Sequence, residues 1–479
     1  MYDPGLLWSP VQPGRHTPES WNDDTVKILL VANGLPPTAF GGVEVYVDQL
    51  AGELVGRGHQ LTIFCRESNT ELPDGALQQE TRHGVKVYRL VNDFKALNQF
   101  RQTFENPQVE QLFDELLDEI DPELVHFHHL IALSSRLPLI SVRRAIPTLV
   151  TVHDFWPICH RVNLLDWRGQ LCGGPRQGGD CFQCILGAFE RIPLWVRVTK
   201  PLRALVPRHA RRRLRRLLGR GDGLPPVVQP LQAVFDERYQ LFRQGLAGAA
   251  RLIVPSEFVG HIMVAFVYPA DRVRVIPIGI SADCSQPNDL SPGRRARGQP
   301  LRFAFIGSLL PLKGVDVLIK AFREVRGAAG LDIHGRADIL PRFSAQLRRL
   351  AKRDRRIRLQ GAFAPEDRGQ VYESFDVLVI PSVVYETFSL VAREALLMGK
   401  PVIAARIGAL EEIIQPGVNG FLVEPGRISE MARTLQSVVD HPEQLDRLVI
   451  PGPVAIVTAG EHADRIESIY RELVGTEGD

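Results

Sequence analysis

The stretch Asp376-Val-Leu-Val-Ile-Pro-Ser-Val-Val-Tyr-Glu-Thr-Phe-Ser-Leu-Val-Ala-Arg-Glu-Ala-Leu-Leu-Met-Gly-Lys-Pro-Val-Ile-Ala404 carries the pattern that decides the fold. Residues 377–380 are a short apolar run ended by a proline, which is typical of a strand buried on both faces of a parallel sheet. Apolar residues then recur at helical spacing from Leu390 until Gly399, and residues 401–404 begin another apolar run. The pattern therefore predicts a strand, a loop, a helix and a second strand.

Two carboxylates lie in this unit, Glu386 in the loop and Glu394 on the helix. At about 3.6 residues per turn, the spacing between them returns Glu394 to nearly the face on which the helix starts. Open α/β sheets bind ligands beyond the carboxyl ends of their strands, so both acids can face one cleft. Between the acids, the free N–H groups of Phe388, Ser389 and Leu390 form a helix start that suits a diphosphate. A nucleotide-sugar fits this arrangement, although the spacing alone fits two solvated surface acids equally well.

The wider context favours the ligand site. Glu-Thr-Phe-Ser-Leu-Val, residues 386–391, and Glu-Ala-Leu-Leu-Met-Gly-Lys-Pro-Val-Ile-Ala, residues 394–404, stand in tandem. This order resembles the donor-site signature of glycosyltransferase family 4, the retaining enzymes of GT-B fold. The resemblance implies that Glu386 contacts the transferred sugar and that Glu394 contacts the ribose of the nucleotide.

Length and charge narrow the class of protein. A chain of 479 residues is too long for one ordinary core and predicts two domains. The 57 Lys and Arg against 55 acids give a net charge of +2, which implies no bulk attraction to nucleic acid. There is no apolar run long enough to span a membrane, and residues 1–24 resemble a disordered leader rather than a signal peptide. We therefore expect a cytoplasmic α/β protein.

The first domain is expected over residues 25–284. After its first strand come Gly41 and Gly42, which let the backbone approach a phosphate closely or simply make a tight turn. The family resemblance favours contact with the donor. The run Thr-Val-His153-Asp ends a later buried strand and resembles the family motif whose histidine reaches the donor sugar. That resemblance implies an orienting role for His153, not that of a general base.

Cysteines cluster after this motif, at Cys159, Cys172, Cys181 and Cys184. Four thiolates in a Gly- and Pro-rich segment without its own core could close a structural zinc site, and free, partly buried thiols are the equal alternative. The histidines near residues 126–129 are more often packed at a strand end than bound to metal.

A basic insertion is expected at about residues 185–245, and residues 191–220 hold eleven Lys and Arg with no acid. Such a segment is typical of contact with anionic lipid head groups. Nucleic acid is less favoured because aromatic residues that could stack on bases are nearly absent, and a solvated insertion is the plain alternative.

A polar linker, residues 285–299, leads to a second α/β domain over residues 300–450. It opens with a strand and the turn Gly-Ser308-Leu-Leu-Pro-Leu-Lys313-Gly, which resembles the family turn whose lysine neutralises the diphosphate. The family usually has an arginine where this chain has Ser308, so Arg336 or Arg406 would have to replace it. The last residues, 451–479, are expected to form a helix that crosses back to the first domain.

The resemblance implies two Rossmann-like domains facing each other across a cleft. It also implies transfer of a sugar, with retention, from a nucleotide-sugar to a hydroxyl of a sugar or lipid-linked acceptor, in cell-surface polysaccharide or glycolipid synthesis. No metal or other cofactor is required for catalysis in that scheme. Other readings stay open: a non-catalytic nucleotide-sugar-binding scaffold, or a phosphorylase or epimerase of GT-B fold.

Overall fold

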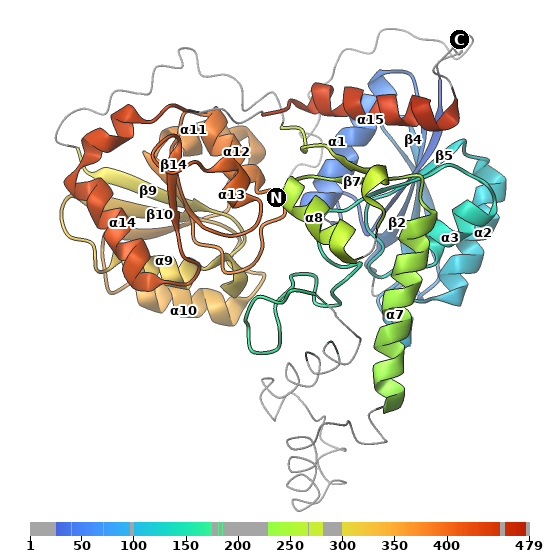
Figure 1. Ribbon diagram of the computed structural model, residues 1–479, viewed down its shortest axis with the longest axis horizontal. Helices are drawn as coiled ribbons and strands as arrows, with labels where there is room; N and C mark the ends of the chain where they lie inside the picture. Colours follow the sequence, from blue (N-terminus) through green and yellow to red (C-terminus); the bar gives the residue numbers. More distant parts are fainter. Residues whose placement is uncertain are drawn as a thin grey trace, which may run out of the picture.

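The computed structural model describes residues 25–39, 41–69, 71–95, 100–174, 181, 184, 229–266, 268–280, 299–450 and 456–475. Two α/β lobes lie side by side (Figure 1), with the second lobe in yellow to orange and the first in blue to green. Each lobe is built on its own sheet, so the predicted α/β class with two Rossmann-like domains is confirmed.

The first sheet has the strand order β3-β4-β2-β1-β5-β6-β7-β8. Its strands are β1 (Lys27–Ala32), β2 (Gln60–Glu67), β3 (Leu77–Arg82), β4 (Val85–Val91), β5 (Leu124–Phe127), β6 (Thr148–Thr151), β7 (Arg251–Val254) and β8 (Val273–Val275). All neighbours are parallel except the β3–β4 pair. In the central strand β1, Leu29 and Val31 enter the core on one face, while Ile28 and Leu30 enter the core on the other. Burial on both faces is why this strand is almost wholly apolar.

The second sheet is entirely parallel, in the order β11-β10-β9-β12-β13-β14. Its strands are β9 (Leu301–Ile306), β10 (Ala329–His334), β11 (Ile357–Gly361), β12 (Val377–Ile380), β13 (Val402–Ala405) and β14 (Gly420–Val423). In β12, Val377 and Val379 face one core and Leu378 and Ile380 face the other. The apolar run from which the fold was predicted is thus a central strand buried on both faces.

Helices cover both sheets. In the first lobe they are α1 (Gly42–Gly56), α2 (Pro107–Ile120), α3 (Leu137–Arg143), α7 (Gln229–Gly248) and α8 (Glu257–Phe266). In the second lobe they are α9 (Val315–Phe322), α10 (Pro341–Ala351), α11 (Arg368–Glu373), α12 (Leu390–Leu397), α13 (Leu410–Ile413) and α14 (Ile428–Asp440). The carboxyl ends of the strands therefore lead into helix starts, which is where such sheets place ligands.

The last helix, α15 (Ala459–Val474), returns to the first lobe (Figure 1). Thr458 and Glu461 close a capping box at its start, which fixes where the helix begins. Ala463, Ile466 and Tyr470 are buried in the core that α1 and β1 share. The helix predicted to cross back from the second domain is confirmed.

Three elements differ from the sequence-based expectation. The strand β3 was not predicted, because it is an exposed edge strand of mostly polar residues. The helix α3 was not predicted either, since it is short. The segment assigned to a basic insertion ends in α7, whose Phe242 and Leu246 lie in the main core of the first lobe. The predicted leader and the basic residues 191–220 lie outside the described residues.

No helix among the described residues is long and apolar enough to cross a membrane.

Candidate active site

The loop after β12 brings Glu386 to the edge of the second sheet. Its side chain is 10% exposed, and one carboxylate oxygen, Oε1, accepts hydrogen bonds from Lys313 Nζ at 2.7 Å and from the Ser382 hydroxyl. The Glu386 carbonyl accepts a hydrogen bond from Ala409 N at 2.9 Å, which ties the loop to the segment after β13. The acid predicted to contact the sugar is therefore held rigidly and is paired with the predicted diphosphate lysine.

Lys313 reaches this position because of the turn after β9. The turn ends at Gly314, whose φ of 68° is left-handed. A Cβ added to Gly314 would lie 1.9 Å from the Pro381 carbonyl oxygen, so only glycine lets the two loops approach this closely. Lys313 stays 35% exposed in its side chain, so its ammonium is accessible to a ligand from solvent.

The start of α12 is strained and partly unsatisfied. Ser389 precedes the helix with φ 59°, a left-handed conformation that is costly for a residue other than glycine. Its hydroxyl is buried and has no hydrogen-bond partner among the described residues. Phe388, just before it, is buried, and its carbonyl accepts a hydrogen bond from the Arg393 guanidinium. The predicted anion site thus has an open helix start and an uncommitted hydroxyl.

Glu394 lies further along α12 and is held by the neighbouring helix. The Tyr372 hydroxyl donates to Glu394 Oε2 at 2.7 Å, and Arg368 lies 3.7 Å from the other carboxylate oxygen. These contacts fix the carboxylate predicted to bind a ribose.

His153 follows β6 on the rim of the first lobe. Its Nε2 lies 3.4 Å from His128 Nδ1, and its ring meets the Tyr46 ring edge-on at a centroid distance of 4.8 Å. Burial holds the pKa of His153 well below its usual value, and His128 and His129 lower it further. His153 is therefore neutral at neutral pH, so its ring can donate one hydrogen bond without carrying charge.

The next residue, Asp154, faces the same rim and pairs with His129. Ile131 N donates to His129 Nδ1 at 3.1 Å, so the proton lies on His129 Nε2, which donates to Asp154 Oδ2 at 2.9 Å. Trp156 N donates to the other carboxylate oxygen, Oδ1, at 2.8 Å. Although burial opposes it, the contacts with His129 and Trp156 keep the pKa of Asp154 below its usual value.

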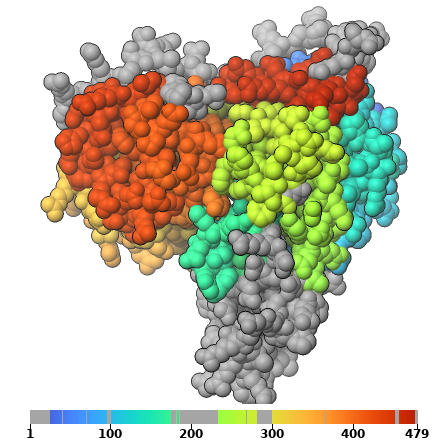
Figure 2. Space-filling view, viewed as in Figure 1, coloured from blue at the N-terminus to red at the C-terminus, as the bar shows by residue number. Residues whose placement is uncertain are grey.

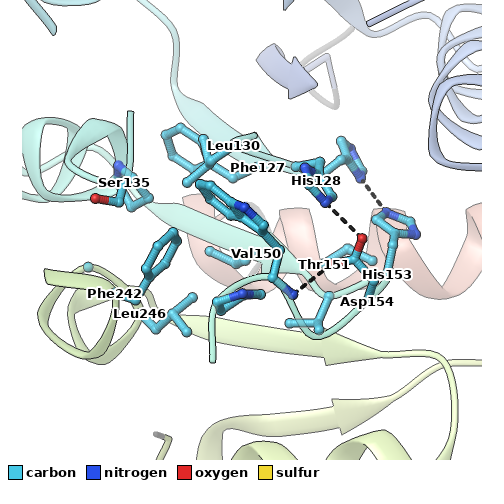
Figure 3. A pocket seen from close by; sticks show the side chains of 16 residues that line it. Phe127, His128, Leu130, Ser135, Val150, Thr151, His153, Asp154, Phe242 and Leu246 are labelled. Atoms are coloured by element: carbon cyan, nitrogen blue, oxygen red, sulfur yellow. Dashed lines mark hydrogen bonds and ion pairs between the residues drawn. The ribbon is translucent and has the colours of Figure 1, made fainter. Parts of the chain in front are cut away.

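A small cavity of about 30 Å³ lies beside this pair (Figure 3). Side chains from the ends of β5 and β6 and from α7 line it, among them Phe127, Val150 and Phe242. The paired His129 and Asp154 also line it, together with His153. The cavity extends the His153 rim into the first lobe.

The glycine pair lies at the start of α1. A Cβ on Gly41 would come within 2.2 Å of the Glu44 carboxylate, while Gly42 has open space around it. Asn33 Nδ2 donates to the same carboxylate at 3.0 Å. A diphosphate approaching Gly41 and Gly42 would have to displace this carboxylate or bind beside it, since like charges repel.

The segment that follows His153 and the loop that holds Glu386 meet at the junction of the lobes. Phe155, two residues after His153, contacts the ring of Tyr385, which precedes Glu386, at a centroid distance of 6.2 Å. The Ser256 hydroxyl donates to the Thr387 carbonyl at 2.8 Å. The segment around residues 155–174 lies at this junction (Figures 1 and 2). The structure thus brings the His153 rim to the Glu386 loop, as the two-domain prediction requires.

Among the described residues, no disulfide joins Cys159, Cys172, Cys181 or Cys184. Burial raises the pKa of Cys181 to about 12, and the thiols of Cys159, Cys184 and Cys172 raise it in the same direction. Gly174 N donates to the Cys172 sulfur at 3.4 Å. Within the described ranges, however, no three His, Cys, Asp or Glu side chains are arranged to hold a metal ion. The zinc site stays a prediction.

Because Ser308 is neutral, the turn predicted to bind the diphosphate has one positive charge fewer than the family pattern. The two arginines expected to replace that charge are each already paired with an acid. Arg336 pairs with Asp338 at 2.7 Å and Arg406 with Glu424 at 3.4 Å, and both arginine side chains are largely exposed. The sequence singled out neither Arg393 nor the interface residues Phe155 and Tyr385.

Solved structures define the class of the fold. A sucrose-phosphate synthase of Thermosynechococcus elongatus superposes with a TM-score of 0.60 at 19% identity, covering 94% of this chain and 100% of that one. Anabaena HepE in complex with UDP gives a TM-score of 0.56 at 18% identity, covering 94% and 97%. These likenesses establish a GT-B architecture.

Sequence comparison then gives the family. The model for Glycosyltransferase Family 4 matches residues 40–224, and the model for Glycosyl transferases group 1 matches residues 300–441. The D-inositol 3-phosphate glycosyltransferase of Mycolicibacterium smegmatis is 33% identical over 248 residues, 48% of this chain and 52% of its own length. The matched part thus spans about half the length of such curated relatives. The chain is thus similar to glycosyltransferase family 4 in its first lobe and to the glycosyl transferases of group 1 in its second.

Proposed function

We propose that the protein is a retaining glycosyltransferase that moves a sugar from a nucleoside diphosphate sugar to an acceptor hydroxyl. The observation that carries the proposal is the Lys313–Glu386 pair beside the open start of α12, across the lobe junction from His153. A cation and a helix start suit a diphosphate, and a buried carboxylate suits the hydroxyls of a sugar. Structures of similar fold have UDP-glucose bound, in HepE, and ADP with acarbose, in a starch synthase IV of Arabidopsis thaliana.

In this scheme the bond between the anomeric carbon and the phosphate oxygen breaks while the acceptor oxygen attacks the same face of the sugar. The acceptor proton passes to the departing phosphate oxygen. Lys313 and the N–H groups at the α12 start stabilise the negative charge that develops on the diphosphate. His153, neutral and fixed by its neighbours, orients the sugar without taking the proton.

The test is turnover with UDP-, GDP- and ADP-sugars, chosen by thermal shift, followed by NMR of the product. We expect one of these donors to be consumed and the anomeric configuration to be retained. Binding without turnover for every acceptor tried would favour the scaffold alternative. An epimerised sugar, or a sugar phosphate as product, would favour the other GT-B chemistries.

We further propose that the acceptor is a sugar or a lipid-linked sugar at the inner face of the membrane, in the synthesis of a cell-surface polysaccharide or glycolipid. The composition of residues 191–220 supports this, because each basic residue near an anionic surface contributes about 1 kcal/mol. The wild type should sediment with anionic vesicles at low salt and not at high salt. A variant with Arg211, Arg212, Arg215 and Arg216 changed to Ser should stay in solution and still use a soluble acceptor. Equal sedimentation of the two proteins would leave this segment as a solvated insertion.

A further inference from the structure

Arg393 is a buried cation that the scheme above does not use. It lies on α12, is only 5% exposed, and its guanidinium carbon stands 3.5 Å from the centre of the Phe388 ring. The guanidinium donates to the Phe388 carbonyl, while its Nε has no hydrogen-bond partner in the part of the chain that the structure describes. Within the described residues, no carboxylate oxygen lies within 4.0 Å of its nitrogens. A buried charge without a counter-ion is costly, so this position calls for an explanation.

The charge persists at neutral pH. Burial lowers the pKa of Arg393 to about 9, while the charge of Glu412 opposes the shift. Glu412 is itself committed elsewhere, since its carboxylate accepts hydrogen bonds from Glu257 N, at 3.2 Å, and Phe258 N at the start of α8. The field of Arg393 is therefore only partly neutralised by protein groups.

The other cations near the predicted diphosphate are already paired. Lys313 contacts Glu386, Arg336 contacts Asp338 and Arg406 contacts Glu424. Of these four side chains, Arg393 is the one without a carboxylate within 4.0 Å. It also bonds to the residue directly before Ser389, at the helix start where the diphosphate is expected.

We propose that Arg393 supplies the second positive charge of the diphosphate site and so replaces the arginine that Ser308 lacks. It also positions the site, because its bond to the Phe388 carbonyl supports the left-handed Ser389 and so the direction of the N–H groups that follow. This inference rests on the proposed function. In a low-dielectric environment such a charge acts on an anion through space, so direct contact is not required.

Calorimetric binding measurements distinguish the effect of the Arg393 charge from the support that its side chain gives to the helix start. The probes are UDP, GDP and ADP, inorganic pyrophosphate, and the matching nucleoside without phosphates. Arg393→Gln keeps a donor for the Phe388 carbonyl and removes the charge. We expect it to bind pyrophosphate and the preferred nucleoside diphosphate about tenfold more weakly, with nucleoside binding unchanged. Arg393→Lys should stay within about threefold of the wild type for all probes.

Two further variants keep the test decisive. Arg356→Gln, which removes an arginine already paired with Asp354 at the amino end of β11, is the matched control and should change no affinity by more than about twofold. Glu412→Gln removes the acid that opposes Arg393 and should tighten pyrophosphate binding, a gain that a purely structural role would not produce. If the Arg393→Gln protein does not fold, the pyrophosphate affinity of Glu412→Gln tests the charge assignment.

Opposite outcomes are clear-cut. Equal loss of nucleoside and diphosphate binding in Arg393→Gln would show a structural role only. Wild-type pyrophosphate affinity in that variant, or unchanged affinity in Glu412→Gln, would overturn the charge assignment while leaving the proposed function intact. If the wild type bound none of the three nucleoside diphosphates, the proposed function would fail together with this inference.

Discussion

At the scale of single residues, the Lys313–Glu386 pair has two consequences for catalysis. The lysine holds the carboxylate in place, and a donor must then share Lys313 with it. We expect Lys313→Ala to lower kcat by about 100-fold or more, because it removes the charge that stabilises the departing diphosphate. Lys320→Ala is the matched control, since Lys320 pairs with Asp316 on α9 at 2.6 Å. Steady-state kinetics with a saturating donor measure the effect, and an unchanged kcat in Lys313→Ala would contradict the role.

Replacement of Glu386 and replacement of Glu394 should change different kinetic parameters. Glu394→Ala should raise the donor KM, because loss of a charge-assisted hydrogen bond to a ribose hydroxyl costs about 1.5–3 kcal/mol. Glu386→Ala should mainly lower kcat, since this carboxylate is expected at the transferred sugar. Tyr372→Phe, which frees the Glu394 carboxylate from its 2.7 Å hydrogen bond, should give a smaller rise in donor KM than Glu394→Ala. Wild-type KM and kcat in both glutamate variants would remove the donor-site assignment.

At the scale of elements, the sequence predicted the strands that are buried on both faces, because burial there requires a continuous apolar run. The strands β1 and β12 are apolar on both faces, so their runs are visible without structure. The strand β3 is not visible, because an exposed edge strand needs no apolar alternation. The role of Arg393 was equally hidden: its neighbours Ala392, Ala395 and Leu396 are buried, but a charge on a helix normally faces solvent. Only the structure shows that its guanidinium folds back to Phe388.

The cysteine segment gives a prediction at the same scale. If Cys159, Cys172, Cys181 and Cys184 close around a metal, protein purified without a histidine tag should contain about one zinc per chain, or an iron–sulfur cluster in its place. Cys181→Ser together with Cys184→Ser should then lose the metal, whereas Cys65→Ser, in the buried strand β2, should keep it. Elemental analysis is the measurement. Less than about a tenth of an equivalent would show free thiols, since a structural site of this kind binds tightly.

At the scale of the whole molecule, the two lobes are joined by polar groups that reach across. The Glu412 carboxylate caps the start of α8 from the other lobe, and Ser256 bonds to the Thr387 carbonyl next to Glu386. The tail crosses back as well, because Tyr470 of α15 contacts His126 Nδ1 at 2.6 Å. The Glu386 loop, the first lobe and the helix α15 are therefore linked through a few polar contacts.

A cluster of histidines from β5, from the loops after β5 and β6 and from α15 should also make the fold sensitive to acid. Burial lowers the pKa of His126, His128 and His153 well below the usual 6.5, and that of His462 to about 4. In the unfolded chain these histidines take up protons near pH 6.5, whereas in the folded protein they stay neutral. The unfolded state thus binds more protons between pH 6.5 and about 4, so stability falls as the pH falls through this window.

Each histidine adds about 1.4 kcal/mol per pH unit to this fall, so four together are large against the 5–15 kcal/mol of a typical domain. Urea unfolding at a series of pH values from about 7.5 to 5 measures the slope. Replacing His128 by Gln should reduce the slope by about one proton, because the amide does not titrate. Paired carboxylates cannot produce the same slope, because their contribution to stability is lost only below about pH 5, outside the range of the measurement. A free energy of unfolding that does not change between about pH 7.5 and 5 would mean that the histidine cluster opens to water. It would also contradict the proposed role of His153 as a neutral side chain that orients the sugar.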